Sequence, residues 1–171
     1  IYSQSVNTET VEYIEVCINE LEKYKAKLYI TDCFNKINNN KIKFPSKTTI
    51  IKKISKTNKI DFLICFGGDG TMLKAAHLVN KLNIPITGIN TGRLGFLANI
   101  PKQNISDLII SLKDKNFDIS PRSIIKVYTS PKIKSSISKF AINEVSITEK
   151  NHLSLISIKA YVNGNFLNTY W

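Results

Sequence analysis

Apolar residues recur at helical spacing near the start of the chain. Within residues 8–27 they stand three or four positions apart, at Val11, Ile14, Ile18 and Leu21. Such spacing places the apolar side chains on one face of a helix. It predicts one amphipathic helix, and Thr8 or Thr10 is expected to be its N-cap because a hydroxyl oxygen can accept a hydrogen bond from the first turn.

The next apolar runs are short and continuous, which is typical of strands that are buried on both faces. They cover residues 27–31, 61–66 and 84–90. Helices are expected between and after these strands, at residues 48–56, 71–81 and 106–115. In the second of these helices, the side chains expected to face inward are Leu73, Ala76, and Val79 or Leu78. The alternation of strand and helix predicts a parallel sheet covered on both faces, which is an α/β fold.

The pattern changes after about Phe117. Four segments rich in branched and aromatic side chains follow without a helical period, at residues 123–130, 139–148, 155–162 and 165–171. Asn163 and Gly164 separate the last two segments and predict a type I′ hairpin turn, whose two central positions both need a positive φ. We therefore expect an α/β domain over residues 1–116 and, over residues 117–171, the beginning of an incomplete all-β domain.

The two ends of the chain suggest a piece of a longer protein. The sequence begins at Ile1 without an initiator Met, and it ends at Trp171 within a strand-like segment. We expect a fragment that is cut at both ends.

The charge balance suggests an anionic partner. Lys and Arg total 24 against 13 Asp and Glu, a formal net charge of +11. All of the basic residues except Arg93 and Arg122 are Lys, however, and they lie among abundant Asn and Ile. Proteins that read nucleic acids favour Arg side chains and interleaved aromatics. We interpret the Lys residues as a solvated surface and expect no nucleic-acid partner.

Composition also bears on location and on metal binding. With 43% hydrophobic residues the chain can bury a core, and it contains neither a leader pattern nor an apolar run of about 18 residues. We expect a cytoplasmic protein with no membrane segment. The three cysteines, Cys17, Cys33 and Cys65, are far apart and form no CxxC pair. We expect reduced, mostly buried thiols and no metal site formed by the protein.

The segment "ICFGGDGTML", residues 64–73, carries the candidate chemistry. A strand that runs through a glycine turn into a helix presents backbone N–H groups and the positive end of a helix dipole, which is where phosphate binds. Neither GxGxxG nor GxxxxGK[ST] is present. Asp69 would repel phosphate, so we expect it to hold or deprotonate a substrate hydroxyl, with Lys74 supplying compensating charge. In the structural alternative, the glycines make a tight turn and Asp69 is only a helix N-cap.

Two further segments favour the chemical interpretation. "GINTGRLGFLANI" at residues 88–100 and "FAINEVSI" at residues 140–147, together with "GGDGT" at residues 67–71, resemble the NAD kinase family in order and separation. The resemblance extends from Asp61 onward, and "IYSQS" is similar to the family's first strand. It implies a Rossmann-like first domain and a β-rich second domain. The implied reaction transfers the terminal phosphate of ATP, or of polyphosphate, to the 2′-hydroxyl of the adenosine ribose of NAD and yields NADP.

The resemblance also implies roles for individual residues. Asp69 matches the family's NAD-contacting aspartate and proton acceptor, and Mg²⁺ would arrive with ATP. The residues expected to bind substrate are Gly68, Gly70, Thr71, Lys74, Asn90, Phe96, Asn143 and Glu144.

Structural interpretations compete with three of these roles. Phe96 could instead pack in the core, and Asn143 and Glu144 could be surface polar positions on a strand. Arg93 could contact phosphate or simply anchor its loop.

Several other functions stay open on the sequence alone. Lipid kinases of the diacylglycerol type and phosphofructokinases also carry GGDG followed by Thr or Ser. A dehydrogenase would need the third glycine that this motif lacks, whereas a dinucleotide sensor or a basic RNA-binding module would bind without catalysis. NAD kinases continue with another Asp-Gly pair and a segment rich in Thr and Gly, so we expect the present chain to bind NAD less tightly than a complete enzyme. By resemblance we also expect a homo-oligomer.

Overall fold

The structure, a computed structural model, describes residues 1–79, 82–92, 95–130, 140–147 and 156–171. The chain divides into two compact units, unit 1 (Ile1–Ser120) and unit 2 (Pro121–Trp171). Each unit is described by itself. No helix within the described ranges is both long enough and apolar enough to cross a membrane.

Unit 1 is built on parallel strands. Its main sheet contains β1 (Tyr2–Ser3), β4 (Leu63–Phe66), β5 (Ile86–Asn90) and β6 (Ile100–Pro101), in that order. A second parallel pair consists of β2 (Tyr29–Thr31) and β3 (Thr49–Ile51). The amino group of Ile1 donates a hydrogen bond of 2.9 Å to the carbonyl of Tyr29, so β2 lies beside the start of β1. The four-stranded sheet and this pair are separate sheets, and their parallel strands alternate with helices along the chain, as in a doubly wound fold.

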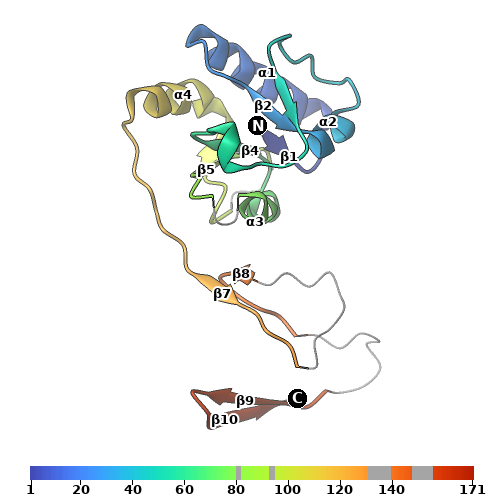
Figure 1. Cartoon of the computed structure of the whole chain (residues 1–171), viewed down its shortest axis with the longest axis vertical. Helices are drawn as coiled ribbons and strands as arrows, with labels where there is room; N and C mark the ends of the chain where they lie inside the picture. Colours follow the sequence, from blue (N-terminus) through green and yellow to red (C-terminus); the bar gives the residue numbers. More distant parts are fainter. Residues whose placement is uncertain (80–81, 93–94, 131–139, 148–155) are drawn as a thin grey trace. The chain divides into compact units, whose positions relative to one another are not determined.

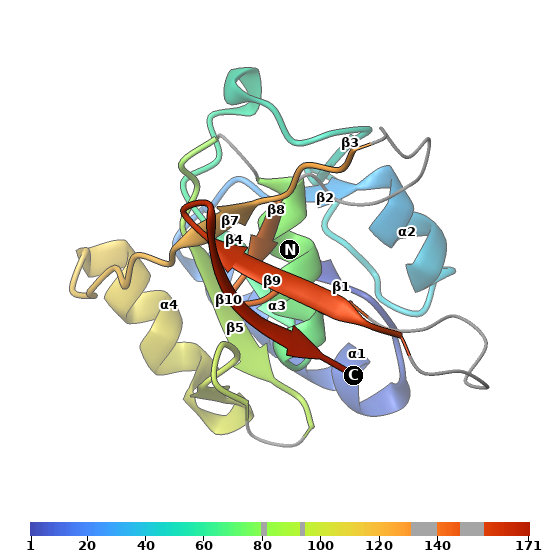
Figure 2. The ribbon, with the colours of Figure 1, turned by 90° about the horizontal axis from the view of Figure 1, so that it is seen from below.

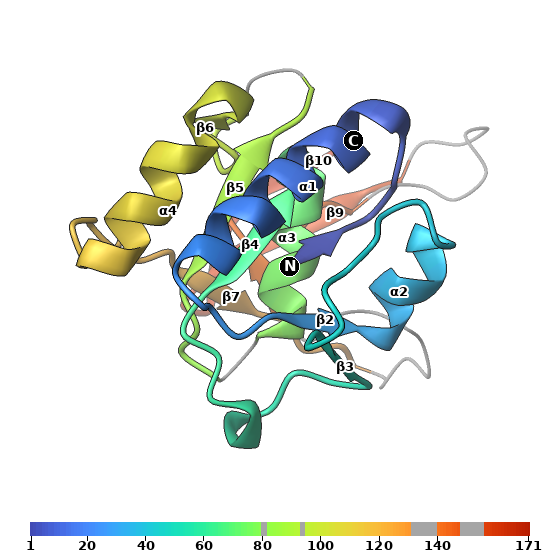
Figure 3. The ribbon, with the colours of Figure 1, turned by 90° about the horizontal axis from the view of Figure 1, so that it is seen from above.

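Helices cover both faces of this sheet, which confirms the predicted α/β, Rossmann-like architecture. The helices are α1 (Thr8–Lys23), α2 (Asp32–Asn38), α3 (Asp69–Leu78) and α4 (Ile105–Asp114), with short 3₁₀ turns η1 (Lys56–Asn58) and η2 (Lys102–Asn104). Figure 1 shows α1 and α4 on one face and α3 on the other, and the view in Figure 3 has α1 and α4 in front of the strands. All four residues of β4 are buried, as expected for a central parallel strand.

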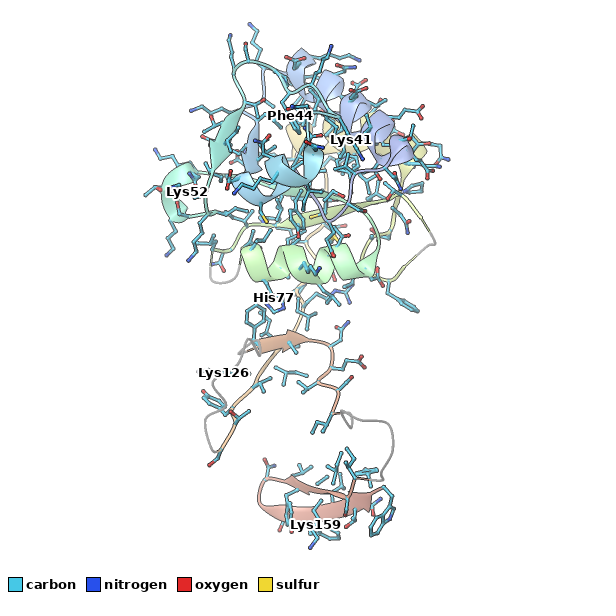
Figure 4. The ribbon with its side chains drawn as sticks, turned by 90° about the vertical axis from the view of Figure 1, so that its right-hand side faces the viewer. Lys41, Phe44, Lys52, His77, Lys126 and Lys159 are labelled. Atoms are coloured by element: carbon cyan, nitrogen blue, oxygen red, sulfur yellow. The ribbon has the colours of Figure 1, made fainter. Side chains whose placement is uncertain are left out.

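The core of unit 1 extends to the α2 side of the sheet. Phe34 on α2 is fully buried, and its ring lies 6.5 Å from that of Tyr2 and 6.1 Å from that of Phe44. Lys41 Nζ donates a 2.8 Å hydrogen bond to the carbonyl of Val6, and Figure 4 labels both Lys41 and Phe44. Burying a side chain such as that of Phe34 contributes about 1.5–3 kcal/mol.

Several helix predictions are confirmed and others are wrong. The helices expected at residues 8–27, 71–81 and 106–115 are present as α1, α3 and α4. The N-cap of α1 is Asn7, whose side-chain oxygen accepts from the N–H of Thr10, so neither predicted threonine is the cap. The buried positions of α3 are Thr71 and Ala75, the residue Val79 that follows the helix is also buried, and Leu78 packs against the core. Leu73 and Ala76, which were predicted to face inward, do not belong to the core, because the buried face of α3 is a different one from that predicted.

The helix predicted at residues 48–56 is wrong, and α2 was not expected. Residues 49–51 are the strand β3, whose branched side chains suit a strand paired with β2, and only the short turn η1 follows. Helix α2 begins where the Thr31 hydroxyl accepts a 3.2 Å hydrogen bond from the N–H of Phe34. Cys17 and Cys65 are buried, which raises the pKa of each thiol to about 12, whereas Cys33 is exposed.

Unit 2 contains antiparallel strands among its described residues. The strand β7 (Ile124–Lys126) pairs with β8 (Phe140–Ile142), and β9 (Ile158–Val162) pairs with β10 (Asn165–Tyr170). Figure 2 shows β9 and β10 as a continuous hairpin. At its turn φ is 51° at Asn163 and 84° at Gly164, which confirms the predicted hairpin.

Candidate functional site

The GGDGT segment lies where β4 ends and α3 begins. The N–H of Gly67 donates a 3.0 Å hydrogen bond to the carbonyl of Ile89, which ties the turn to β5. Gly67 has a φ of +146°, and a Cβ there would lie 2.3 Å from Thr71 Oγ1. Only glycine fits this position, because the turn needs both the unusual φ and the close approach of the helix.

Asp69 is the first residue of α3, and its carboxylate points to the loop between β5 and β6. Oδ2 accepts a 2.9 Å hydrogen bond from the N–H of Phe96. Oδ1 accepts hydrogen bonds from the N–H groups of Leu97, at 2.9 Å, and Ala98, at 3.1 Å. The N-cap of α3 is Gly68, which makes no side-chain hydrogen bond, so the alternative in which Asp69 is the N-cap is wrong.

These hydrogen bonds favour the ionised form of Asp69. The N–H of Ala98 makes the largest contribution, followed by those of Leu97 and Phe96, and together they lower the pKa of the carboxyl from its ordinary value of 3.8. Asp69 is therefore a carboxylate at neutral pH. A carboxylate in this state accepts hydrogen bonds, as the chemical interpretation of the motif requires.

Asn90, at the end of β5, holds the same loop from another side. Its side-chain nitrogen donates a 3.1 Å hydrogen bond to the carbonyl of Ala98, and its side-chain oxygen accepts a 2.8 Å hydrogen bond from the N–H of Gly92. The carbonyl of Ala98 is thus bound by Asn90 and its N–H by Asp69. Three residues predicted for the site, Asp69, Asn90 and Phe96, are brought together by this loop.

The Phe96 ring is 92% exposed, which excludes the alternative in which it packs in the core. Its backbone is bound by Asp69 while its ring is open to solvent. An exposed aromatic ring is suited to stacking on a planar base. Arg93, considered as a phosphate contact, lies outside the described residues.

The other predicted residues of unit 1 differ in their surroundings. A Cβ at Gly68 or Gly70 would meet nothing within 4 Å, so the backbone there is open to a ligand. The side chain of Thr71 is buried against the turn at Gly67. Lys74 is exposed and belongs to the second turn of α3, because the helix begins at Asp69.

Asn143 and Glu144 belong to unit 2, directly after β8. Both are exposed. The N–H of Glu144 donates a 2.9 Å hydrogen bond to the carbonyl of Ile142, and Asn143 between them has a φ of 72°, which together make a tight γ-turn. Asparagine tolerates this φ better than most residues. The turn presents both polar side chains at the end of a strand.

Sequence reasoning missed two glycines that shape the site. A Cβ at Gly88 would lie 2.6 Å from Met72 Sδ and 2.9 Å from Ala98 Cα, so this position lets α3 and the β5–β6 loop close on β5. A Cβ at Gly95 would lie 2.1 Å from Asp69 Oδ1. The available signal was the glycine within a strand at Gly88, which indicates a close backbone approach.

Cavities lie near both ends of the strands among the described residues of unit 1. One, of about 930 Å³, is lined by residues that precede β2 and β4, among them Leu28 and Ile60, and by the end of α4. The other, of about 340 Å³, lies beside Asn90 and Pro101. Ligands of open α/β sheets bind outside the carboxyl ends of the strands, and Asn90 and Asp69 both lie at that end. Among the described side chains, no three His, Cys, Asp or Glu gather to hold a metal ion.

Comparisons with known proteins identify the family of the chain. The family model "ATP-NAD kinase N-terminal domain" matches residues 6–117, most of unit 1. The chain belongs to the NAD kinase family. An NAD kinase of Christiangramia forsetii is 35% identical over 175 residues, which cover 100% of this chain and 59% of that protein. One from Porphyromonas gingivalis is 33% identical over 171 residues, covering 99% of this chain and 58% of that protein.

The fold likeness extends to a solved structure. The crystal structure of yeast NADH kinase complexed with NADH matches with a TM-score of 0.67 at 16% identity, covering 98% of this chain and 53% of that one. At this identity the match concerns the fold alone. The chain spans 59% of the length of each of the first two NAD kinases that it matches.

Proposed function

We propose that this chain forms the nucleotide-binding part of an NAD kinase. The reaction would transfer the terminal phosphoryl group of ATP, or of polyphosphate, to the 2′-hydroxyl of the adenosine ribose of NAD and yield NADP. The observation that carries this proposal is the family match over residues 6–117, which contain the carboxylate of Asp69 at the carboxyl ends of parallel strands.

Asp69 would bind the hydroxyl that receives the phosphoryl group. A carboxylate offers about four lone-pair positions, and backbone N–H groups use three of them. One position is left to accept a hydrogen bond from the ribose hydroxyl and to orient it toward the donor. As the phosphoryl group transfers, the same oxygen can take the hydroxyl proton, a role typically worth about 10²- to 10⁴-fold in rate.

The start of α3 would hold the phosphates. The first N–H groups of a helix lack partners within it, and the helix dipole makes this end positive. Gly68 and Gly70 leave their surroundings open, so phosphate oxygens can approach the backbone closely. Lys74, exposed on the second turn, adds positive charge to the same helix.

Mg²⁺ would reach the site with the donor, where it neutralises charge on the phosphate oxygens. The Asp69 oxygens face backbone N–H groups, and among the described residues no three His, Cys, Asp or Glu gather to hold a metal ion. A hard cation that arrives with a nucleotide takes ligands from phosphates and water.

The remaining contacts would recognise NAD. Phe96 offers an exposed ring to the adenine, and Asn90 fixes the loop that carries it. Asn143 and Glu144 would bind the ribose or amide groups of NAD, since an amide can donate and accept while a carboxylate accepts from hydroxyls. A homo-oligomer in the cytoplasm is the expected form of the complete enzyme.

A binding experiment tests the acceptor class. Titration calorimetry would compare the chain with a longer form. The longer form continues past Trp171 with the matching C-terminal part of the Christiangramia forsetii NAD kinase. NAD should bind the longer form and bind the chain more weakly, because the shorter protein offers fewer contacts.

The same titration separates the alternatives. Fructose 6-phosphate and diacylglycerol vesicles should give no signal with either form. Binding of the sugar phosphate or the lipid without binding of NAD would assign the GGDGT site to another kinase class. Equal NAD affinity of the two forms would contradict the role given to the missing contacts.

A further inference from the structure

The loop between β5 and β6 wraps the Asp69 carboxylate with its backbone. Three consecutive N–H groups, from Phe96 to Ala98, donate to the two carboxylate oxygens over 2.9–3.1 Å. The residue before them is Gly95, and a Cβ built there would lie 2.1 Å from Asp69 Oδ1, 2.6 Å from Cγ and 2.9 Å from Oδ2. The carboxylate occupies the space that a side chain at position 95 would fill.

We propose that Gly95 is a positioning residue for Asp69. Because position 95 has no side chain, the carboxylate can reach the three N–H groups, and Asp69 and the loop that carries Phe96 hold each other in place. The role of this contact in binding NAD rests on the proposed function, whereas its steric and hydrogen-bonding basis does not.

Space, rather than backbone conformation, is what requires glycine here. Gly95 does not adopt a φ in the left-handed region, so an alanine could take the same backbone conformation. Gly92, three residues earlier in the same loop, also lacks such a φ, and a Cβ there would meet nothing within 4 Å. Gly92→Ala is therefore a matched control for Gly95→Ala.

The arrangement links the contacts proposed for two parts of NAD, the ribose hydroxyl and the adenine. The carboxylate that would orient the ribose hydroxyl also anchors the N–H of Phe96, whose exposed ring would meet the adenine. A displacement of Asp69 by a methyl group at position 95 would therefore move both contacts together. Preorganised groups of this kind need to be held within about 0.5 Å.

The first test uses nuclear magnetic resonance on the 171-residue chain. Gly95→Ala should raise the pKa of the Asp69 carboxyl toward its ordinary value of 3.8, because N–H donors are lost. The amide protons of Phe96, Leu97 and Ala98 should lose protection from exchange with solvent. Gly92→Ala should change neither quantity. An unchanged pKa and unchanged protection in Gly95→Ala would overturn the proposal.

A double-mutant cycle keeps the test decisive if Gly95→Ala is poorly folded. Asp69→Ala removes the carboxylate and with it the steric conflict, so Gly95→Ala should lower the melting temperature in the parent chain and much less in the Asp69→Ala background. Equal losses in both backgrounds would show that Gly95 acts independently of Asp69 and would contradict the proposal.

Kinetics in the longer form separates positioning from general stability. Loss of folded protein lowers the apparent kcat and leaves KM unchanged, whereas misplacement of Asp69 and Phe96 should also raise KM for NAD several-fold. If the parent has no kinase activity, the proposed function fails, while the resonance and melting results still decide the role of Gly95.

Discussion

Three backbone N–H groups from one loop converge on a single carboxylate, and this contact sets the chemistry of Asp69. The side chain was predicted from the sequence as an acid beside a phosphate-binding turn, because strand, glycine turn and helix occur in that order. The partners of the carboxylate were not predictable, since they lie 27–29 residues further along the chain. Local spacing carries no information on contacts at that separation.

The lowered pKa of Asp69 predicts a pH-dependent contribution to stability. A carboxyl whose pKa is lower in the folded state stabilises the protein fully above its ordinary value of 3.8, and the contribution disappears as pH falls through the lowered value. Asp69→Asn should therefore reduce the melting temperature at pH 6–7, and the difference from the parent should shrink below about pH 4.

A matched control for this measurement is Asp61→Asn. Asp61 is exposed and lies just before β4, at the strand end opposite Asp69. Thermal melts of the three proteins at pH 7, 5 and 3 make the comparison. If Asp69→Asn differs from the parent equally at all three values, the three N–H groups do not stabilise the ionised form.

At the scale of elements, the sequence predicted those with a strong pattern. The periodic helix α1, the continuous apolar strands β4 and β5, and the Asn163-Gly164 turn were all expected. The sequence predicts a helix in place of the strand β3, because a run of three residues is too short to distinguish a strand from a helix. The pairing of β3 with β2 makes it a strand. Helix α2 was missed because seven residues are too few for a clear period.

The start of α1 offers a test of capping at this scale. Asn7, which was not predicted, accepts a 2.8 Å hydrogen bond from the N–H of Thr10, whereas the predicted cap Thr8 lies inside the helix. Asn7→Ala should lower the free energy of unfolding by about 1 kcal/mol, as measured by urea denaturation. Thr8→Ala should change it by less than about 0.5 kcal/mol. The reverse order of effects would restore Thr8 as the cap.

At the scale of the whole molecule, two units of different character follow each other along the chain. Unit 1 holds the parallel sheet and brings together Asp69, Asn90 and Phe96, while unit 2 holds antiparallel strands and the γ-turn at Asn143. The change from alternating strand and helix to strands alone was visible in the sequence. The contacts that the Asp69 carboxylate makes within unit 1 join residues far apart in the chain, and the pattern of a single sequence does not contain such contacts.

The most direct measurement is NADP formation by the longer form, incubated with NAD, ATP and Mg²⁺ and read by an NADP-specific dehydrogenase. We predict a signal that requires all three components and that falls by about 10²- to 10⁴-fold in Asp69→Asn. No NADP from a folded protein that binds NAD, with ATP and with polyphosphate as donor, would contradict the assignment and would leave a dinucleotide-binding protein without phosphoryl transfer.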